Sequence, residues 1–170
     1  MASGKSSVGR QLAARLGVPF VDIDSEVEKL AGRGIPELFR DGGEAAFRDF
    51  ERQATVRAEE VVPSVIATGG GWMSRPELRS MWPEAVYVWL AARPETVFKR
   101  IGRRYDLRPM LDPEAPERSI RDLLAAREPD YARAGLAVHT DELGITAVAK
   151  RIEEMVRVKN SVEIGKEHSE

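Results

Sequence analysis

Apolar residues recur at helical spacing near the start of the chain and then gather in short runs separated by further helical segments. Val8, Leu12 and Leu16 are spaced four residues apart and are followed by Gly17, which predicts a first helix ending at the glycine. Short apolar runs predict four strands, at residues 19–22, 64–67, 85–90 and 136–139. Further helices are predicted at residues 25–30, 35–40, 44–61, 76–82, 94–103, 117–127 and 145–158, with a break at Pro129 and a short helix to residue 134.

This alternation of strands and helices predicts parallel βαβ units and an α/β fold. The run at residues 85–90 is almost continuously apolar, which is typical of a strand buried on both faces of a parallel sheet. A chain of 170 residues has the size of one domain, which we expect to span residues 1–158 and to be followed by a charged tail at 159–170.

Residues 2–7, Ala-Ser-Gly-Lys-Ser-Ser, match the second half of the phosphate-binding pattern G-x-x-x-x-G-K-[ST]. The first glycine of the pattern would fall before Met1, so we expect the preceding strand to be absent from this chain. Gly4 allows backbone N–H groups to face an anion, Lys5 supplies a positive charge, and Ser6 can bind Mg²⁺. A chance occurrence of this short motif is the alternative.

Net charge, apolar runs and cysteine content exclude several classes of protein and of site. The net charge of −2 argues against a dedicated nucleic-acid binder, and no apolar run is long enough to cross a membrane. The absence of cysteine excludes disulfides and thiolate metal sites. The first residues are polar and lack the apolar core of a signal peptide, so we expect a cytoplasmic protein without membrane or nucleic-acid partners.

Two acids follow the first predicted strand. Asp22 and Asp24 lie where ligands of open α/β sheets bind, outside the carboxyl end of a strand. They could hold Mg²⁺ through water and accept a proton from an attacking hydroxyl. For this short motif taken alone, helix capping by Asp24 or Ser25 is the better explanation.

Glycines and arginines supply further candidates. Three glycines in Thr68–Gly71 follow the second predicted strand, and we favour close approach of a ligand there over a plain flexible turn. Arg48 lies on a predicted helix, where the alternative is a surface arginine that pairs with Asp49 or Glu51.

Two more arginines lie further along the chain. Arg108 lies in the proline-rich segment 105–116, predicted to be a loop, and could swing over phosphates, although a charged surface loop would explain it equally well. Arg127 ends a predicted helix, where the helix dipole alone would favour it. His139 and His168 have no neighbouring residues in the sequence that would complete a metal site.

In their order and spacing these motifs resemble those of the shikimate kinase family over residues 1 to about 156. The resemblance implies a three-layer P-loop kinase fold, similar to nucleoside monophosphate kinases, with a parallel sheet flanked by helices and its first central strand absent. It also implies substrate-binding helices at about 24–61 and a lid at about 104–116. The motifs are Gly4-Lys5-Ser6, Asp22-Ile23-Asp24, Gly43-Glu44-Ala45-Ala46-Phe47-Arg48, Val65-Ile66-Ala67-Thr68-Gly69-Gly70-Gly71, Arg108-Pro109-Met110-Leu111 and Arg127-Glu128-Pro129-Asp130-Tyr131.

The resemblance implies a monomeric enzyme of aromatic amino acid biosynthesis that uses ATP and Mg²⁺ to phosphorylate the 3-hydroxyl of shikimate. Its implied residues are Lys5, Asp24 and Arg108 for catalysis; Ser3, Gly4, Lys5, Ser6, Ser7, Arg100 and Arg108 for ATP; Asp24, Arg48, Gly69, Gly70, Gly71 and Arg127 for shikimate; and Ser6 and Asp22 for Mg²⁺.

The sequence also departs from the family pattern. Ala2 occupies a position where many members have glycine, and we expect it to be tolerated through a negative φ. Two other functions stay open: a related kinase for a small hydroxy acid such as gluconate, and a nucleotide- or metabolite-binding protein without turnover, which only the short N-terminus supports.

Overall fold

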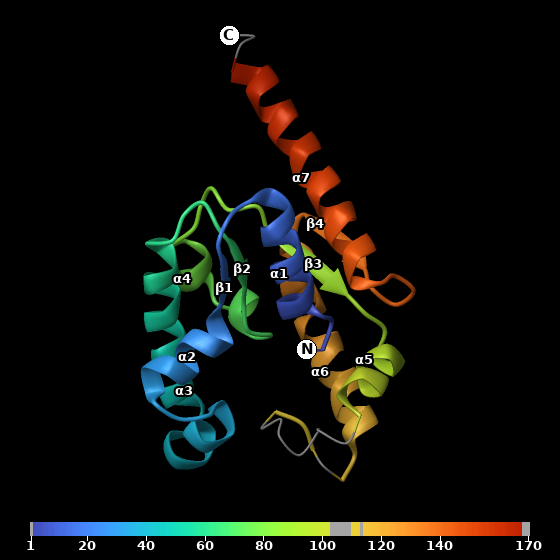
Figure 1. Ribbon diagram of the computed structural model, residues 1–170. Coiled ribbons are helices and arrows are strands. Elements are labelled where there is room, and N and C mark those ends of the chain that lie inside the picture. The colour runs from blue at the N-terminus through green and yellow to red at the C-terminus, as the bar shows by residue number, and fades with distance from the viewer. Residues whose placement is uncertain (1, 103–109, 113, 168–170) are drawn as a thin grey trace.

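The structure is a computed structural model (Figure 1) that describes residues 2–102, 110–112 and 114–167. Helices alternate with short strands along these residues, as predicted for an α/β fold. In chain order the elements are α1 (Lys5–Leu16), β1 (Phe20–Asp22), α2 (Ile23–Ala31), α3 (Ile35–Glu59), β2 (Val65–Ala67), the 3₁₀ helix η1 (Trp72–Ser74), α4 (Pro76–Arg79), β3 (Val88–Ala91), α5 (Pro94–Ile101), α6 (Pro116–Tyr131), the 3₁₀ helix η3 (Ala132–Ala134), β4 (Leu136–His139) and α7 (Ile145–Glu167).

The strands form two parallel pairs. β1 pairs with β2, so that Phe20 lies opposite Val65 and Asp22 opposite Ala67, and β3 pairs with β4. Among the described residues, each of the four strands has one hydrogen-bonded neighbour. Because paired parallel strands end at the same edge, Asp22 and the glycines that follow Ala67 are brought to one place.

Helix α1 connects the two strand pairs. Its buried residues Val8 and Leu12 belong to one apolar cluster, which also contains Val65 of β2 and Val88 of β3. β4 and α7 complete this cluster, and α7 then projects away from the rest of the molecule (Figure 1). The same packing fixes the first turn of α1, where the predicted phosphate-binding residues lie, relative to the strands.

Two further clusters flank the strands. Ile23 and Val27 of α2 and Leu38 of α3 are fully buried against one another. Val97 of α5 packs on Ile120 of α6, both fully buried, in a separate cluster. In Figure 1, α2 and α3 lie on one side of α1, whereas α5 and α6 lie on the other.

The predicted division of the long helical segment near residue 42 is confirmed as a kink. α3 runs from Ile35 to Glu59, but Gly43 has φ 67° and ψ −170°, which are not helical angles. Glycine adopts this conformation without steric cost, so the Gly42-Gly43 pair lets the two halves of the helix differ in direction.

The predicted break at Pro129 is wrong, because α6 continues through this residue to Tyr131. A proline has a fixed φ that suits a helix, and here it removes one backbone bond only in the last turns. Tyr131, two residues later, is held by a hydrogen bond to Gly70 and by ring contact with Trp89, so tertiary contacts stabilise the end of the helix.

Two helices differ in length from their predicted bounds. α7 extends to Glu167, beyond the end expected near residue 158, because its lysines and glutamates are good helix formers even without apolar spacing. α4 comprises only Pro76–Arg79, whereas a helix to residue 82 was expected. Within the described ranges, no helix combines the length and the apolar character needed to cross a membrane.

Candidate active site

The first turn of α1 has the backbone geometry of an anion site. Gly4 precedes the helix with φ 91°, in the left-handed region that glycine adopts without strain. The turn contains no acidic residue, so the N–H groups at this helix end and the Lys5 charge are not opposed by a carboxylate of the same turn. Ser3 is buried and Ser7 exposed on either side of Ser6 and Lys5. This geometry suits phosphate oxygens, as the motif predicts.

Ala2 does not have the negative φ expected from the sequence. Its φ is 45°, in the left-handed region, and it is the one described non-glycine residue with a positive φ. A Cβ atom there crowds the following carbonyl, at a cost of about 1–2 kcal/mol. Ala2 packs against the apolar cluster of α5 and α6, which holds it in this conformation as the chain turns into Gly4.

The two acids after β1 have different structural roles. Asp22 is the N-cap of α2, and its Oδ1 accepts a hydrogen bond from the backbone N–H of Asp24 at 3.2 Å. The prediction that Asp24 or Ser25 caps the helix is therefore wrong, because both residues already lie inside its first turn. Asp24 is exposed, and capping no longer explains its presence.

Arg48 forms an ion-pair network rather than lying solvated on the surface. Its side chain is only 19% exposed and donates to Oε2 of Glu51 at 2.8 Å and to Oε1 of Glu44 at 2.7 Å. Glu51 was one of the two partners considered from the sequence, whereas Asp49 is not among the ion-pair partners of Arg48. The guanidinium also lies over the ring of Phe47, which limits its orientation further.

Glu51 is a buried acid that the sequence analysis did not select as functional. It is fully buried, and its Oε1 has no hydrogen-bond partner among the described residues. Burial raises the pKa of this carboxyl, and the bond from Arg48 only partly opposes the shift. Arg75 lies 3.8 Å from the same carboxylate as a second cation. The signal was available, since Glu51 follows Phe47 by four residues on an apolar helix face.

Two of the glycines after β2, Gly69 and Gly71, are required by space rather than by backbone angles. None of Gly69, Gly70 and Gly71 has a positive φ. A Cβ atom on Gly69 would lie 2.9 Å from Oε1 of Glu51 and 3.1 Å from Oδ1 of Asp24. A Cβ atom on Gly71 would lie 2.9 Å from an Nη atom of Arg48. The backbone at Gly69 and Gly71 therefore lies directly against these carboxylates and the guanidinium, and the predicted close approach of a ligand stays a prediction.

Helix α6 reaches the glycine loop from the other side. The hydroxyl of Tyr131 donates to the carbonyl of Gly70 at 2.6 Å, and its ring lies 5.9 Å from that of Trp89 on β3. Burial raises the pKa of Tyr131, so the phenol stays protonated, and interaction with Arg127 one turn earlier opposes the shift. Arg127 is thus placed beside the residue that contacts the loop.

The prediction that Arg100 binds ATP stays a prediction. Its guanidinium donates to the side chain of Thr140 at 2.9 Å and also to the backbone carbonyl of Thr140, just after β4. Arg108 lies outside the described residues, as does most of the predicted lid.

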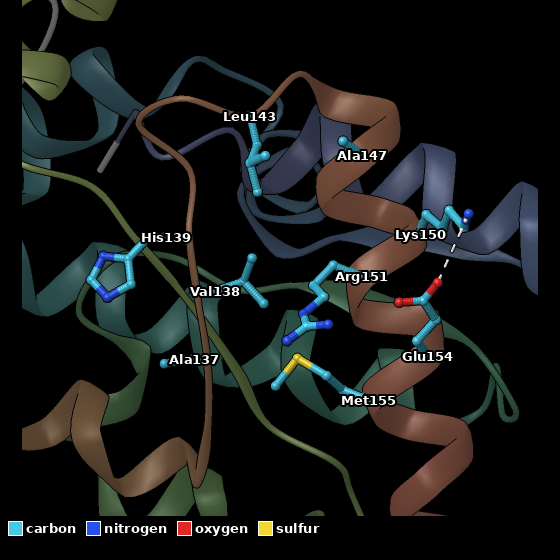
Figure 2. Close-up of a pocket in the computed structure, with 9 residues that line it drawn as sticks. All are labelled: Ala137, Val138, His139, Leu143, Ala147, Lys150, Arg151, Glu154 and Met155. Atoms are coloured by element: carbon cyan, nitrogen blue, oxygen red, sulfur yellow. Dashed lines mark ion pairs between the residues drawn. The ribbon is translucent and has the colours of Figure 1, made fainter.

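A separate hollow of about 540 Å³ lies between β4 and α7 (Figure 2). It contains none of the residues predicted for the site, and its polar groups include His139, Arg151 and an ion pair of 4.0 Å between Lys150 and Glu154. In the described parts of the chain, no three or more acidic or histidine side chains are grouped so that they could hold a metal ion.

The structure thus brings several predicted residues into one constellation. Asp24 lies against Gly69 and Arg48 lies against Gly71, and Arg127 lies beside Tyr131, which bonds to Gly70. α1, which begins with the phosphate-type turn, packs on β1 and β2, whose carboxyl ends lead into the same constellation. An exposed carboxylate beside guanidinium groups and backbone donors can bind an acidic polyol and take a proton from one of its hydroxyls.

Comparison with known proteins agrees with this constellation. Residues 1–157 match the family described as shikimate kinase. The shikimate kinase of Bradyrhizobium diazoefficiens is 40% identical over 158 residues, which cover 92% of this chain and 76% of the relative. The shikimate kinase of Caulobacter vibrioides is 46% identical over 143 residues, which cover 84% and 71% of the two chains.

Solved structures give the same result. Shikimate kinase from Acinetobacter baumannii in complex with shikimate superimposes with a TM-score of 0.85 at 31% identity, covering 94% of this chain and 89% of that one. Shikimate kinase from Aquifex aeolicus gives 0.80 at 32% identity, covering 94% of each chain. With the motif order, the fold and the family match in agreement, the chain belongs to the shikimate kinase family.

Proposed function

We propose that this chain transfers the γ-phosphoryl group of ATP to the 3-hydroxyl of shikimate and releases ADP and 3-phosphoshikimate. The observation that carries the proposal is the contact of Asp24 and Arg48 with the glycine loop at the edge where β1 and β2 end. Family membership supports the reaction, and one structural neighbour was solved with shikimate bound.

The acceptor would be held by its carboxylate and its hydroxyls. Arg48 of α3 lies against the glycine loop and Arg127 of α6 lies beside Tyr131, which bonds to that loop, and two planar guanidinium groups suit a carboxylate. Backbone N–H groups of Gly69–Gly71 would contact shikimate, because the glycines themselves carry no side chain. The ion pair with the buried Glu51 would hold Arg48 in place. If the pair separated, the Glu51 carboxylate would be buried without a compensating positive charge.

In the transfer step, Asp24 would orient the attacking hydroxyl and accept its proton as the oxygen bonds to the γ-phosphorus and ADP leaves. Lys5 and the N–H groups of the first turn of α1 would stabilise the phosphate charge. We further propose that Arg108 approaches the phosphates, as the resemblance implies. We also propose that the enzyme acts as a monomer, as the resemblance implies.

Mg²⁺ fits the oxygen donors at this edge. Ser6 would supply a hydroxyl from the first turn of α1, and Asp22 would supply a carboxylate, one oxygen of which accepts from the Asp24 N–H. This donor set agrees with the preference of Mg²⁺ for few protein oxygens together with water and phosphate. When bound, the ion would neutralise charge on the phosphates of ATP.

The test is a coupled assay of ADP release with shikimate, with gluconate and without an acceptor. We expect ADP release that depends on shikimate, one phosphomonoester product by ³¹P NMR, and little release with gluconate. Equal or faster turnover with gluconate would refute the choice of acceptor. Shikimate binding by calorimetry without any turnover would instead favour a binding protein.

A further inference from the structure

Tyr131 connects two parts of the site that lie 61 residues apart in the sequence. Its ring rests on Trp89 of β3, and its hydroxyl donates to the carbonyl of Gly70 at 2.6 Å. The residue lies on α6, the helix that also carries Arg127. One side chain therefore joins a strand, a helix and the loop after β2.

The carbonyl of Gly70 and the N–H of Gly71 belong to the same planar peptide unit. In a trans peptide these two groups point in opposite directions, so a bond that fixes one also fixes the other. Gly71 in turn lies against Arg48, because a Cβ atom on it would come within 2.9 Å of the guanidinium. Holding this peptide unit therefore sets both a backbone donor and the space available to Arg48.

We infer that Tyr131 is a positioning residue for the acceptor: it holds the Gly70–Gly71 peptide so that the Gly71 N–H and the Arg48 guanidinium stay aligned for a carboxylate or hydroxyl of the substrate. The inference rests on the proposed function for the identity of that substrate. Tyr131 itself acts through the loop, and it couples the position of the loop to that of Arg127.

Nothing else in the site replaces this bond within the described residues. Three consecutive glycines have the largest backbone freedom of any residues, and those in the loop have no side chains to pack. The backbone bond from Trp72 N–H to the Gly69 carbonyl at 3.2 Å closes a turn around Gly70 and Gly71, immediately before the 3₁₀ helix η1. That bond does not involve the Gly70 carbonyl, whose orientation is therefore held by Tyr131.

The chain offers a matched control in Tyr87. Its hydroxyl donates to the backbone carbonyls of Trp82 at 2.9 Å and Arg79 at 3.2 Å, and it is also half-buried. These carbonyls belong to α4 and the turn after it, not to the glycine loop. Tyr87→Phe therefore removes a phenolic hydrogen bond of the same kind without touching the Gly70–Gly71 peptide.

The experiment compares Tyr131→Phe and Tyr87→Phe with the unmodified chain. For Tyr131→Phe we expect the KM for shikimate, and its Kd by calorimetry, to rise about 5- to 10-fold, the effect of losing one buried hydrogen bond. The KM for ATP should stay within about twofold, and the loss of Tm should match that of Tyr87→Phe. An unchanged shikimate KM, or an equal rise in Tyr87→Phe, would overturn the inference.

A second measurement separates this inference from the proposed function. In ¹H–¹⁵N NMR spectra without substrate, Tyr131→Phe should shift the Gly71 amide signal, whereas Tyr87→Phe should leave it in place. An unmoved Gly71 signal would refute the positioning role even if shikimate is the substrate. If the unmodified chain neither binds nor phosphorylates shikimate, the proposed function fails, while a shifted Gly71 signal would still support the link between Tyr131 and the loop.

Discussion

Replacing Asp24 by asparagine separates catalysis from helix stability. The change keeps the size of the side chain but removes its charge and its capacity to accept a proton. Because Asp22 caps α2 and accepts the N–H of residue 24, the substitution leaves the cap bond intact. Any effect on kcat therefore reports on the carboxylate itself, provided that the variant remains folded.

The expected loss follows from the role of a general base. A positioned base contributes about 10²-fold or more in rate, which corresponds to about 2.7 kcal/mol of transition-state stabilisation. The KM for ATP should hardly change, because the phosphate-binding turn lies on α1. The negative charge of Asp24 also helps to raise the pKa of Glu51, so its removal should lower that pKa towards the ordinary value.

Glu26→Gln is the matched control, since it removes an acid from the same helical turn and breaks a surface ion pair with Lys29. Both variants lose a similar dipole interaction, so their melting temperatures should be alike. The assay is steady-state ADP release with both substrates varied. A kcat for Asp24→Asn close to that of the unmodified chain, or an equal loss in Glu26→Gln, would refute the base role.

Three more predictions address other features. Ala2→Gly should raise the Tm by about 2–4 °C, because it relieves the left-handed strain, and an unchanged or lower Tm in calorimetry would contradict this. Replacing Arg48 or Arg127 by methionine should raise the KM for shikimate at least about 10-fold, because each replacement removes a charged contact to the carboxylate. Arg52→Met, on the exposed face of α3, should leave this KM unchanged. A rise confined to the KM for ATP would contradict the carboxylate contact. Since burial raises the Glu51 pKa, the native state binds this proton more tightly than the unfolded chain. The free energy of unfolding, measured in urea relative to Glu51→Gln, should therefore fall as pH rises from about 4.5, and a rise with pH would show that the ion pair outweighs burial.

The order of elements could be predicted because it depends on local patterns. The strand at residues 136–139 and the start of α5 at Pro94 agree with their predicted positions, since apolar runs and an N-terminal proline are strong local signals. The α6 helix passes through Pro129 against the local signal because Tyr131 is anchored by residues distant in sequence. The tertiary contacts of Tyr131 therefore outweighed the low helix propensity of Pro129.

The site was predictable where residue type alone carries chemistry. Asp24, Arg48 and the three glycines were selected from residue type and motif order, and the structure places Asp24 beside Gly69 and Arg48 beside Gly71, whereas their binding roles stay predictions. The cap could not be assigned from sequence, because the choice between Asp22 and Asp24 depends on the residue at which the backbone turns helical. Glu51 was missed although it follows Phe47 by four residues on one helix face, because that spacing does not establish full burial, which depends on packing.

The division of the strands into two pairs has a consequence for the behaviour of the protein in solution. Within the described residues, the backbone on one side of each strand has no partner strand, and such edges are templates for pairing with another chain. Self-association should therefore increase with concentration, and sedimentation profiles that stay unchanged over a wide concentration range would show that α1 and the other helices shield these edges.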